Sequence, residues 1–161
     1  MIFATVGSQT PFDRLVRALD AWCARGQAQV LAQIGAGGYE PRHMRWLRMC
    51  TPAEFRDHCR AAELIVAHAG MGSVLTALEF GKPLLLVPRR GDLGETRNDH
   101  QLATARWLRG RPGIEVADGE DTLAAALDAW LPGRDSRGQA PIAPSAQPRL
   151  LEALRRFVGE P

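Results

Sequence analysis

The stretch that decides the fold is residues 64–101, LIVAHAGMGSVLTALEFGKPLLLVPRRGDLGETRNDHQ. Leu64–Ala67 is a short apolar run of the kind found in strands that are covered on both faces, and Leu84–Val87 is a second one. The segment between them predicts a helix, because Gly81 and Pro83 stand where a helix characteristically ends. Strand, helix and strand in this order predict an α/β fold with a parallel sheet.

The turn after the first of these strands consists mainly of small residues. Gly70 and Gly72 allow the backbone to approach a ligand closely, and Ser73 either caps or begins the helix. A helix N-terminus attracts phosphate, because it carries free amides and the positive end of the helix dipole. Arg89 and Arg90 follow the second strand, and guanidinium groups suit planar anions, although paired arginines in a loop are also common on solvated surfaces. The stretch therefore predicts a site for a ligand that contains a diphosphate.

Composition limits the class of protein. A chain of 161 residues with 45% hydrophobic and 24% charged residues fits one globular domain with a sizeable core. A formal charge of +2, without a basic stripe that carries aromatic residues, argues against nucleic acid as a partner. No apolar run approaches the roughly 20 residues that span a bilayer, and the N-terminus does not resemble a signal peptide. Three cysteines without paired metal spacing indicate reduced thiols in a cytoplasmic protein, most simply as small hydrophobic residues.

The rest of the chain adds further strand and helix signals. Strands are expected at 1–6, 29–34, 44–49 and 114–117, and helices at 12–22, 51–62, 98–108 and 122–131. Thr51, Pro52 and Glu54 match a capped start of the helix at 51–62, and Asn98 is a plausible N-cap for the helix at 98–108.

The glycine cluster at 35–38 invites comparison with a dinucleotide fingerprint. That fingerprint requires glycines that open a helix, with an acidic residue about 20 positions later. Here the glycines lead into Tyr39, Glu40 and Pro41, which indicate a loop.

The C-terminal region changes character at Pro132. Residues 1–131 form the predicted domain, residues 132–148 are rich in Gly, Pro, Ser and Gln and predict a flexible linker, and residues 149–161 predict an amphipathic helix. That helix packs on its own domain, on a partner subunit or on anionic lipid, and the sequence leaves these three alternatives open.

These motifs together resemble the C-terminal domain of glycosyltransferase family 28. The likeness rests on HAGMGS, GKP, the paired arginines and NDHQ, and it extends from VGSQTPFDRL near the start to NDHQLATA. More narrowly, the chain is similar to small subunits that form the catalytic, donor-binding half of a split GT-B glycosyltransferase. These include bacterial exopolysaccharide subunits of the PssE type and the cytosolic subunit of the eukaryotic dolichol-linked N-acetylglucosaminyltransferase. The resemblance implies a single Rossmann-like domain with a doubly wound parallel sheet.

The resemblance also implies which residues surround the nucleotide sugar. It places the loop at Thr51 near the uracil base, and it implies that Asp99 and Gln101 bind hydroxyls of the donor sugar. Thr76 is a departure, because family members often carry Glu there to bind the ribose. The full set that the resemblance and the local chemistry assign to the site is Gly7, Ser8, Thr51, His68, Gly70, Met71, Gly72, Ser73, Thr76, Arg89, Arg90, Asn98, Asp99, His100 and Gln101.

The function that the resemblance implies is inverting transfer from a UDP-sugar without a metal or another cofactor. Loops of the RRGDLGE type suggest a glucuronate donor, with Arg89 or Arg90 binding its carboxylate. The acceptor would be a saccharide linked to a polyprenyl diphosphate. Because the first strand begins at Met1, we expect acceptor binding and the general base on a separate, membrane-anchored subunit. That partner would hold this cytoplasmic chain at the inner face of the plasma membrane.

Two other functions remain compatible with the sequence. A non-catalytic subunit that binds a nucleotide sugar would use the same pocket residues. A nucleotide-sugar epimerase-like hydrolase shares the GT-B layout, but it needs two domains and acid/base carboxylates on one chain, and 161 residues are too few for that.

Overall fold

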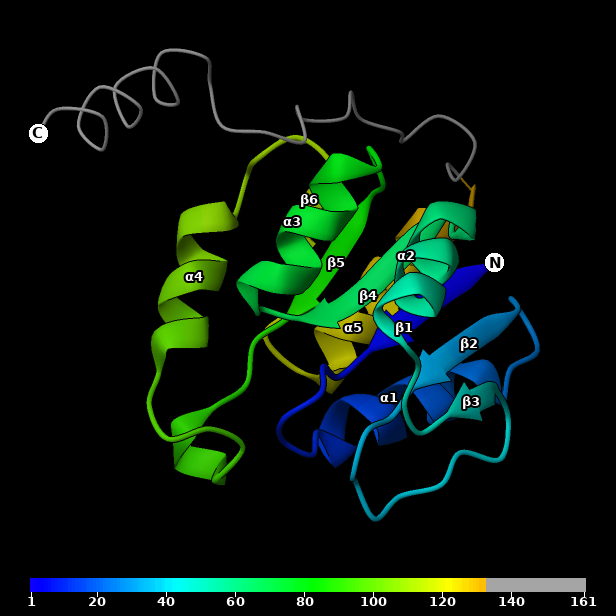
Figure 1. The fold of residues 1–161 in the computed structure, drawn as a ribbon, viewed down its shortest axis with the longest axis horizontal. Helices are drawn as coiled ribbons and strands as arrows, with labels where there is room; N and C mark the ends of the chain where they lie inside the picture. The colour runs from blue at the N-terminus through cyan, green and yellow to red at the C-terminus, as the bar shows by residue number, and fades with distance from the viewer. Residues whose placement is uncertain (133–161) are drawn as a thin grey trace, which may run out of the picture.

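The computed structural model describes residues 1–132, which contain every helix and strand reported below. Six parallel strands form one sheet in the order β3-β2-β1-β4-β5-β6. The predicted α/β class and the doubly wound parallel sheet are therefore confirmed (Figure 1). The predicted linker at 132–148 and helix at 149–161 lie outside the described residues, apart from Pro132.

The strands are short apolar runs, as the sequence predicts for a sheet that is covered on both faces. Every residue of β1, β2 and β5 is buried, whereas β3 at the edge is partly exposed. The pairing places Ile2 of β1 between Val30 of β2 and Leu64 of β4. The strands span Ile2–Thr5 (β1), Val30–Gln33 (β2), Arg45–Leu47 (β3), Leu64–His68 (β4), Leu84–Val87 (β5) and Ile114–Val116 (β6).

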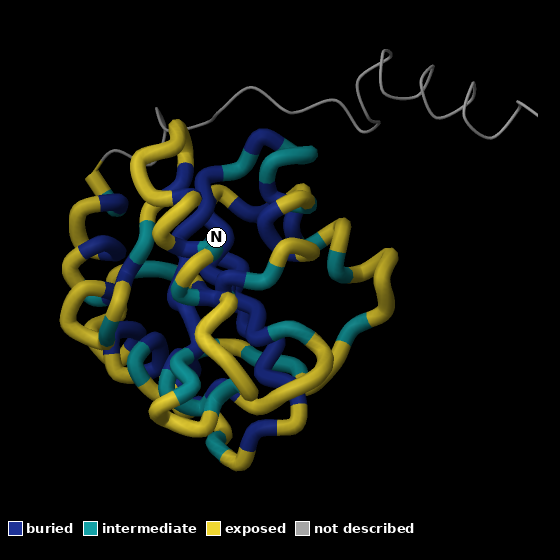
Figure 2. Tube along the Cα trace, turned by 90° about the vertical axis from the view of Figure 1, so that its left-hand side faces the viewer, coloured by how far each residue is buried: buried dark blue, intermediate teal, exposed yellow. Residues whose placement is uncertain are grey.

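The helices cover both faces of the sheet. They span Asp13–Cys23 (α1), Pro52–Ala61 (α2), Met71–Glu79 (α3), His100–Leu108 (α4) and Glu120–Trp130 (α5), with a 3-10 turn at Gly91–Leu93 (η1). One hydrophobic cluster joins one face of the sheet to α1 and α5, and a second joins the opposite face to α2, α3 and α4. Figure 1 shows α2 and α3 in front of the sheet, and Figure 2 shows the buried residues gathered inside the trace.

Local signals in the sequence explain most helix boundaries. Thr51 forms a complete capping box with Glu54 at the start of α2, as predicted. The prediction for α4 was two residues early, because the helix begins at His100. Asn98 does not cap it: the capping position is Asp99, whose carboxylate binds the amide of Gly91 instead of a helix amide.

The strand order reverses direction between β1 and β4. From β1 the chain winds outward to β2 and β3, then returns to β4 and winds the other way. In open α/β sheets, ligands bind at the carboxyl ends of the strands on either side of such a switch point. The loop after β1 and the glycine turn after β4 both lie at this point.

Candidate functional site

A cavity of about 1110 Å³ lies at the carboxyl edge of the sheet, at the switch point. Its size suits a ligand as large as a nucleotide conjugate. The walls come from the loop after β1, the start of α2, the turn into α3 and the loop between β5 and α4. The lining residues are Thr5, Val6, Gly7, Ser8, Gln9, Thr10, Gln33, Met49, Cys50, Pro52, Phe55, Arg56, His68, Gly70, Gly72, Ser73, Thr76, Arg89, Thr96, Arg97, Asn98, His100 and Gln101.

The imidazole of His68 is seated between two glycines on different loops. A Cβ added to Gly7 would lie 2.7 Å from Cε1 of this ring, and a Cβ added to Gly70 would lie 2.2 Å from its Nε2. Gly7 also has a φ of 79°, which side chains disfavour. Gly70, to which the sequence assigned close approach of a ligand, and Gly7, another predicted site residue, are therefore also needed to accommodate His68.

His68 is neutral at physiological pH. Burial, reinforced by the charge of Arg89, lowers the pKa of His68 to about 4, although a hydrogen bond with the Thr5 backbone acts in the opposite direction. The Nδ1 atom is buried and has no hydrogen-bond partner among the described residues. Buried polar atoms without partners are uncommon, so this ring, which belongs to a residue that lines the cavity, keeps an unused hydrogen-bonding position.

The N-terminus of α3 also faces the cavity. No side chain caps this helix at Gly70, in contrast to the capping box of α2. Gly72 and Ser73 line the cavity, and a Cβ on Gly72 would meet nothing within 4 Å. Thr76 lines it too, and its hydroxyl donates to the Gly72 carbonyl, whereas Met71 is exposed and lies outside the lining. This arrangement leaves first-turn amides available to an anion.

Arg89 binds the protein itself. It is only 2% exposed, and its Nη2 donates to the carbonyls of Val6 and Thr10, each at 2.7 Å. Its Nη1 donates to the carbonyl of Pro11 and, at 3.3 Å, to that of Glu95. Burial lowers the pKa of Arg89, against the attraction of Glu95. The structure thus gives this guanidinium a role that differs from the predicted anion contact: it joins the loop after β1 to the loop after β5.

Arg90 also binds another part of the protein instead of facing the cavity. Its guanidinium forms a bidentate ion pair with Asp92, two residues later, and Arg90 is absent from the cavity lining. Its backbone amide donates to Glu95, which also accepts two hydrogen bonds from Arg14 of α1. The predicted pair of anion-binding arginines is therefore engaged in shaping the loop between β5 and α4.

The NDHQ segment is divided between cavity and loop. Asn98, His100 and Gln101 line the cavity, whereas Asp99 does not. Gln101 is buried, and its side-chain oxygen accepts a hydrogen bond from the amide of Arg89. The Asn98 side chain contacts Nδ1 of His100 and accepts from its amide.

The opposite wall is formed by the start of α2. Cys50, Pro52 and Phe55 line the cavity, whereas Thr51 between them turns its hydroxyl and amide toward Glu54. Arg56 of α2 lines the cavity as well, and its guanidinium forms a bidentate pair with Glu79 of α3.

The cavity lining carries cationic side chains and no anionic ones among the described residues. Its lining includes Arg56, Arg89 and Arg97, and no described lining residue is Asp or Glu. Arg97 was missed by the sequence reasoning, which began this motif at Asn98. The available signal was its place immediately before NDHQ, in the same polar loop.

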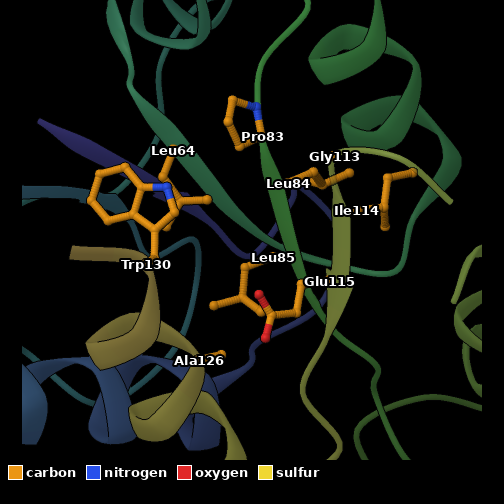
Figure 3. A pocket seen from close by; sticks show the side chains of 9 residues that line it. All are labelled: Leu64, Pro83, Leu84, Leu85, Gly113, Ile114, Glu115, Ala126 and Trp130. Carbon is orange, nitrogen blue, oxygen red and sulfur yellow. The ribbon is translucent and has the colours of Figure 1, made fainter. Parts of the chain in front are cut away.

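A second cavity, of about 280 Å³, lies at the opposite edge of the sheet (Figure 3). It is bounded by the first residues of β4, β5 and β6 together with Trp130 of α5, and Glu115 is its one charged lining residue. Its apolar walls lack the glycine turn and the cations of the larger cavity, so it is a poor match for a phosphate-containing ligand.

Within residues 1–132, no three His, Cys, Asp or Glu side chains gather as metal ligands would. In the same range, no helix has both the length and the apolar character needed to cross a membrane.

Comparison with protein families gives one match that spans most of the chain. The model of the glycosyltransferase family 28 C-terminal domain matches residues 1–146. Residues 133–146 of this match lie beyond the described structure.

Curated relatives include the protein named UDP-N-acetylglucosamine transferase subunit ALG13. The mouse protein is 32% identical over 117 residues, which cover 66% of this chain and 10% of the relative. The Yarrowia lipolytica protein is 25% identical over 137 residues, which cover 76% of this chain and 67% of the relative. The chain thus spans about a tenth of the mammalian protein and about two thirds of the yeast one.

Solved structures share the fold at low sequence identity. The calicheamicin glycosyltransferase CalG4 matches with a TM-score of 0.60 at 21% identity, covering 98% of this chain and 43% of that one. The solution structure of ALG13 matches with a TM-score of 0.57 at 19% identity, covering 95% of this chain and 93% of that one. These likenesses establish the Rossmann-like domain architecture seen in GT-B enzymes.

Proposed function

The chain belongs to the family of glycosyltransferase family 28 C-terminal domains, and from this premise we propose that it is the donor-binding subunit of a split GT-B glycosyltransferase. It would bind a UDP-sugar in the cavity of about 1110 Å³ and transfer the sugar only with a second subunit that supplies the acceptor. The matched relatives named as transferase subunits support this division of labour.

One observation carries the proposal: the uncapped start of α3 opens into a large cavity whose described lining includes no carboxylate. A diphosphate that leaves during glycosyl transfer needs its growing negative charge stabilised. Free helix amides at Gly72 and Ser73, with the side chain of His68, suit that purpose. Asp or Glu in the lining would repel the same group.

The lining also favours a transferase half over the hydrolase alternative. An epimerase-like hydrolase needs carboxylates for acid and base chemistry. His68, with its pKa lowered to about 4, is a poor proton acceptor at neutral pH. We therefore propose that the general base belongs to the partner, which is consistent with inverting transfer that uses no metal.

The partner, in this proposal, is a membrane-anchored acceptor-binding subunit, and the acceptor is a saccharide on a polyprenyl diphosphate. The chain would then act at the cytoplasmic face of the membrane in exopolysaccharide synthesis. Support for this part comes from the resemblance to exopolysaccharide subunits and from the relatives' designation as subunits.

For the donor sugar we propose glucuronate, because the loop between β5 and α4 resembles RRGDLGE-type loops and contributes Arg97 to the lining, where a guanidinium suits a carboxylate. A specific observation favours a second candidate, UDP-N-acetylglucosamine, since that donor is printed in the names of the matched relatives.

The first experiment is a binding screen by amide chemical shifts on the isotope-labelled full chain. UDP-glucuronate, UDP-glucose, UDP-galactose and UDP-N-acetylglucosamine are titrated separately, with ADP-glucose as the base control. We expect uridine ligands to move the amides of Gly7, Gly70 and Gly72, and to leave Gly113 of the second cavity unchanged. Silent spectra, or shifts confined to Gly113, would remove the proposal.

The second experiment separates an enzyme subunit from a non-catalytic binder. The chain is co-expressed with its acceptor-binding partner, and transfer of labelled sugar to membrane lipid is measured with and without the chain. Transfer that requires both proteins supports the split enzyme. Transfer by the partner alone would assign this chain a regulatory role, and efficient transfer by this chain alone would contradict the split arrangement.

A further inference from the structure

We propose that Arg97 binds an anionic group of the donor, either a phosphate or a sugar carboxylate. This inference rests on the proposed function of the cavity as a nucleotide-sugar site. It replaces the sequence-based assignment of the same task to Arg89 and Arg90.

The other arginines near the cavity already have partners in the protein. Arg89 is 2% exposed and donates to four backbone carbonyls. Arg56 makes a bidentate pair with Glu79, with bonds of 2.6 and 2.9 Å. Arg90 pairs with Asp92 and does not line the cavity. To bind a ligand, each of these guanidinium groups would first have to give up existing partners.

Arg97 is in a different position. It lines the cavity and is exposed. Among the described residues it has no ion pair, hydrogen bond or aromatic ring contact. Its five N–H donors are therefore available to a ligand, in the forked geometry that matches phosphate and carboxylate.

The carboxylates nearest in sequence form no ion pair with Arg97. Glu95 accepts two hydrogen bonds from Arg14, and Asp99 accepts from the amide of Gly91. Asp92 is paired with Arg90. Because the described lining adds no Asp or Glu, Arg97 has no carboxylate partner at the cavity wall. A cation without a protein partner at the wall of a cavity attracts an anionic ligand to that cavity.

Arg97 and the start of α3 contribute to the cavity from different loops. It precedes Asn98, and both line the cavity together with His100 and Gln101 at the start of α4. The start of α3 contributes Gly72 and Ser73 to another part of the lining. The cavity thus has two cationic features that are not engaged by other protein groups, the helix N-terminus and Arg97. Together they match a ligand with two phosphates or with phosphates and a carboxylate.

The test compares Arg97→Gln and Arg97→Lys with the parent chain in titrations with uridine, UDP, UDP-glucose and UDP-glucuronate. Arg106→Gln is the matched control, because Arg106 is an exposed arginine of α4 outside the cavity lining. We expect Arg97→Gln to weaken binding of its anionic ligand about tenfold or more, Arg97→Lys to retain part of the affinity, and Arg106→Gln to have no effect.

The ligands identify the anion. An equal loss for UDP, UDP-glucose and UDP-glucuronate, with uridine unaffected, assigns Arg97 to a phosphate. A loss restricted to UDP-glucuronate assigns it to the sugar carboxylate. Unchanged affinity for all three charged ligands overturns the inference, as does an equal loss for uridine. If the parent chain binds none of the four, the proposed function itself fails.

Discussion

Replacing Arg89 by methionine is expected to destabilise the protein before it affects any ligand directly. The guanidinium is buried beneath the loop after β1, and its carbon centre lies 4.6 Å from the ring centroid of Phe12. Methionine keeps most of the apolar contact but removes every donor. Arg89→Lys keeps a charge with fewer and differently directed donors.

The magnitude follows from the hydrogen bonds that are lost. Two donors from Nη2 reach Val6 and Thr10 at 2.7 Å, a third bond reaches Pro11, and the 3.3 Å bond to Glu95 is weaker. A hydrogen bond to a charged group contributes roughly 1.5–3 kcal/mol, and water will replace part of what is lost at a loop. We therefore expect Arg89→Met to lower the free energy of unfolding by about 3–5 kcal/mol, and Arg89→Lys by about half as much.

The assay is urea unfolding of the full-length parent and both variants, followed by circular dichroism, with UDP binding measured on the fraction that remains folded. The joining role predicts a loss of stability first, and weaker UDP binding as a consequence of a displaced Gly7 loop. A variant with parental stability and much weaker UDP binding would refute this reasoning, because it would make Arg89 a direct ligand as the sequence suggested.

Three further predictions test the surroundings of the cavity. Gly70→Ala should lower the free energy of unfolding by about 1–3 kcal/mol, since its Cβ would lie 2.2 Å from the His68 ring. Gly72→Ala should leave thermal stability unchanged or slightly higher, because a Cβ there meets nothing within 4 Å. It should still weaken UDP binding, because the methyl group fills the space at the start of the helix. The pKa of His68 is lowered to about 4 in the folded chain, whereas in the unfolded chain it is about 6.5. Between these two pH values the ring is protonated in the unfolded chain but not in the folded one, and this difference stabilises the unfolded state. Stability should therefore fall by up to about 3 kcal/mol between pH 6.5 and 4, and His68→Gln should flatten that part of the pH profile of urea unfolding; an identical slope in the variant would argue against a neutral, buried ring. Glu54→Ala should remove the capping box with Thr51 and cost about 1 kcal/mol, with UDP affinity intact, as judged by thermal melting beside a UDP titration.

Much of the architecture could be predicted from local sequence patterns. The apolar runs at Leu64–Ala67 and Leu84–Val87 became β4 and β5, and Thr51 with Glu54 formed the capping box expected of them. The glycine cluster at 35–38 was correctly interpreted as a loop. These features depend on residues a few positions apart, where backbone geometry and capping chemistry act directly.

The α4 boundary shows where local patterns fail. Asn98 has the chemistry of an N-cap, yet the helix starts at His100, because the side chain of Asn98 turns to His100 and Asp99 binds the amide of Gly91 across the loop. Competing hydrogen-bond partners in a polar loop decided between neighbouring residues of similar propensity.

The sequence alone thus determined the parallel α/β class and the glycine turn after β4, since periodicity and turn residues encode both, and the family resemblance added the doubly wound order of the sheet. It could not determine which arginine is available to a ligand. Arg89 finds three of its four carbonyl partners 78 to 83 residues earlier in the chain, and Arg14 reaches Glu95 across 81 residues. Only the packing of β1 beside β4 brings those carbonyls and that carboxylate within hydrogen-bonding distance, and this packing commits Arg89 and Glu95 while leaving Arg97 facing the cavity.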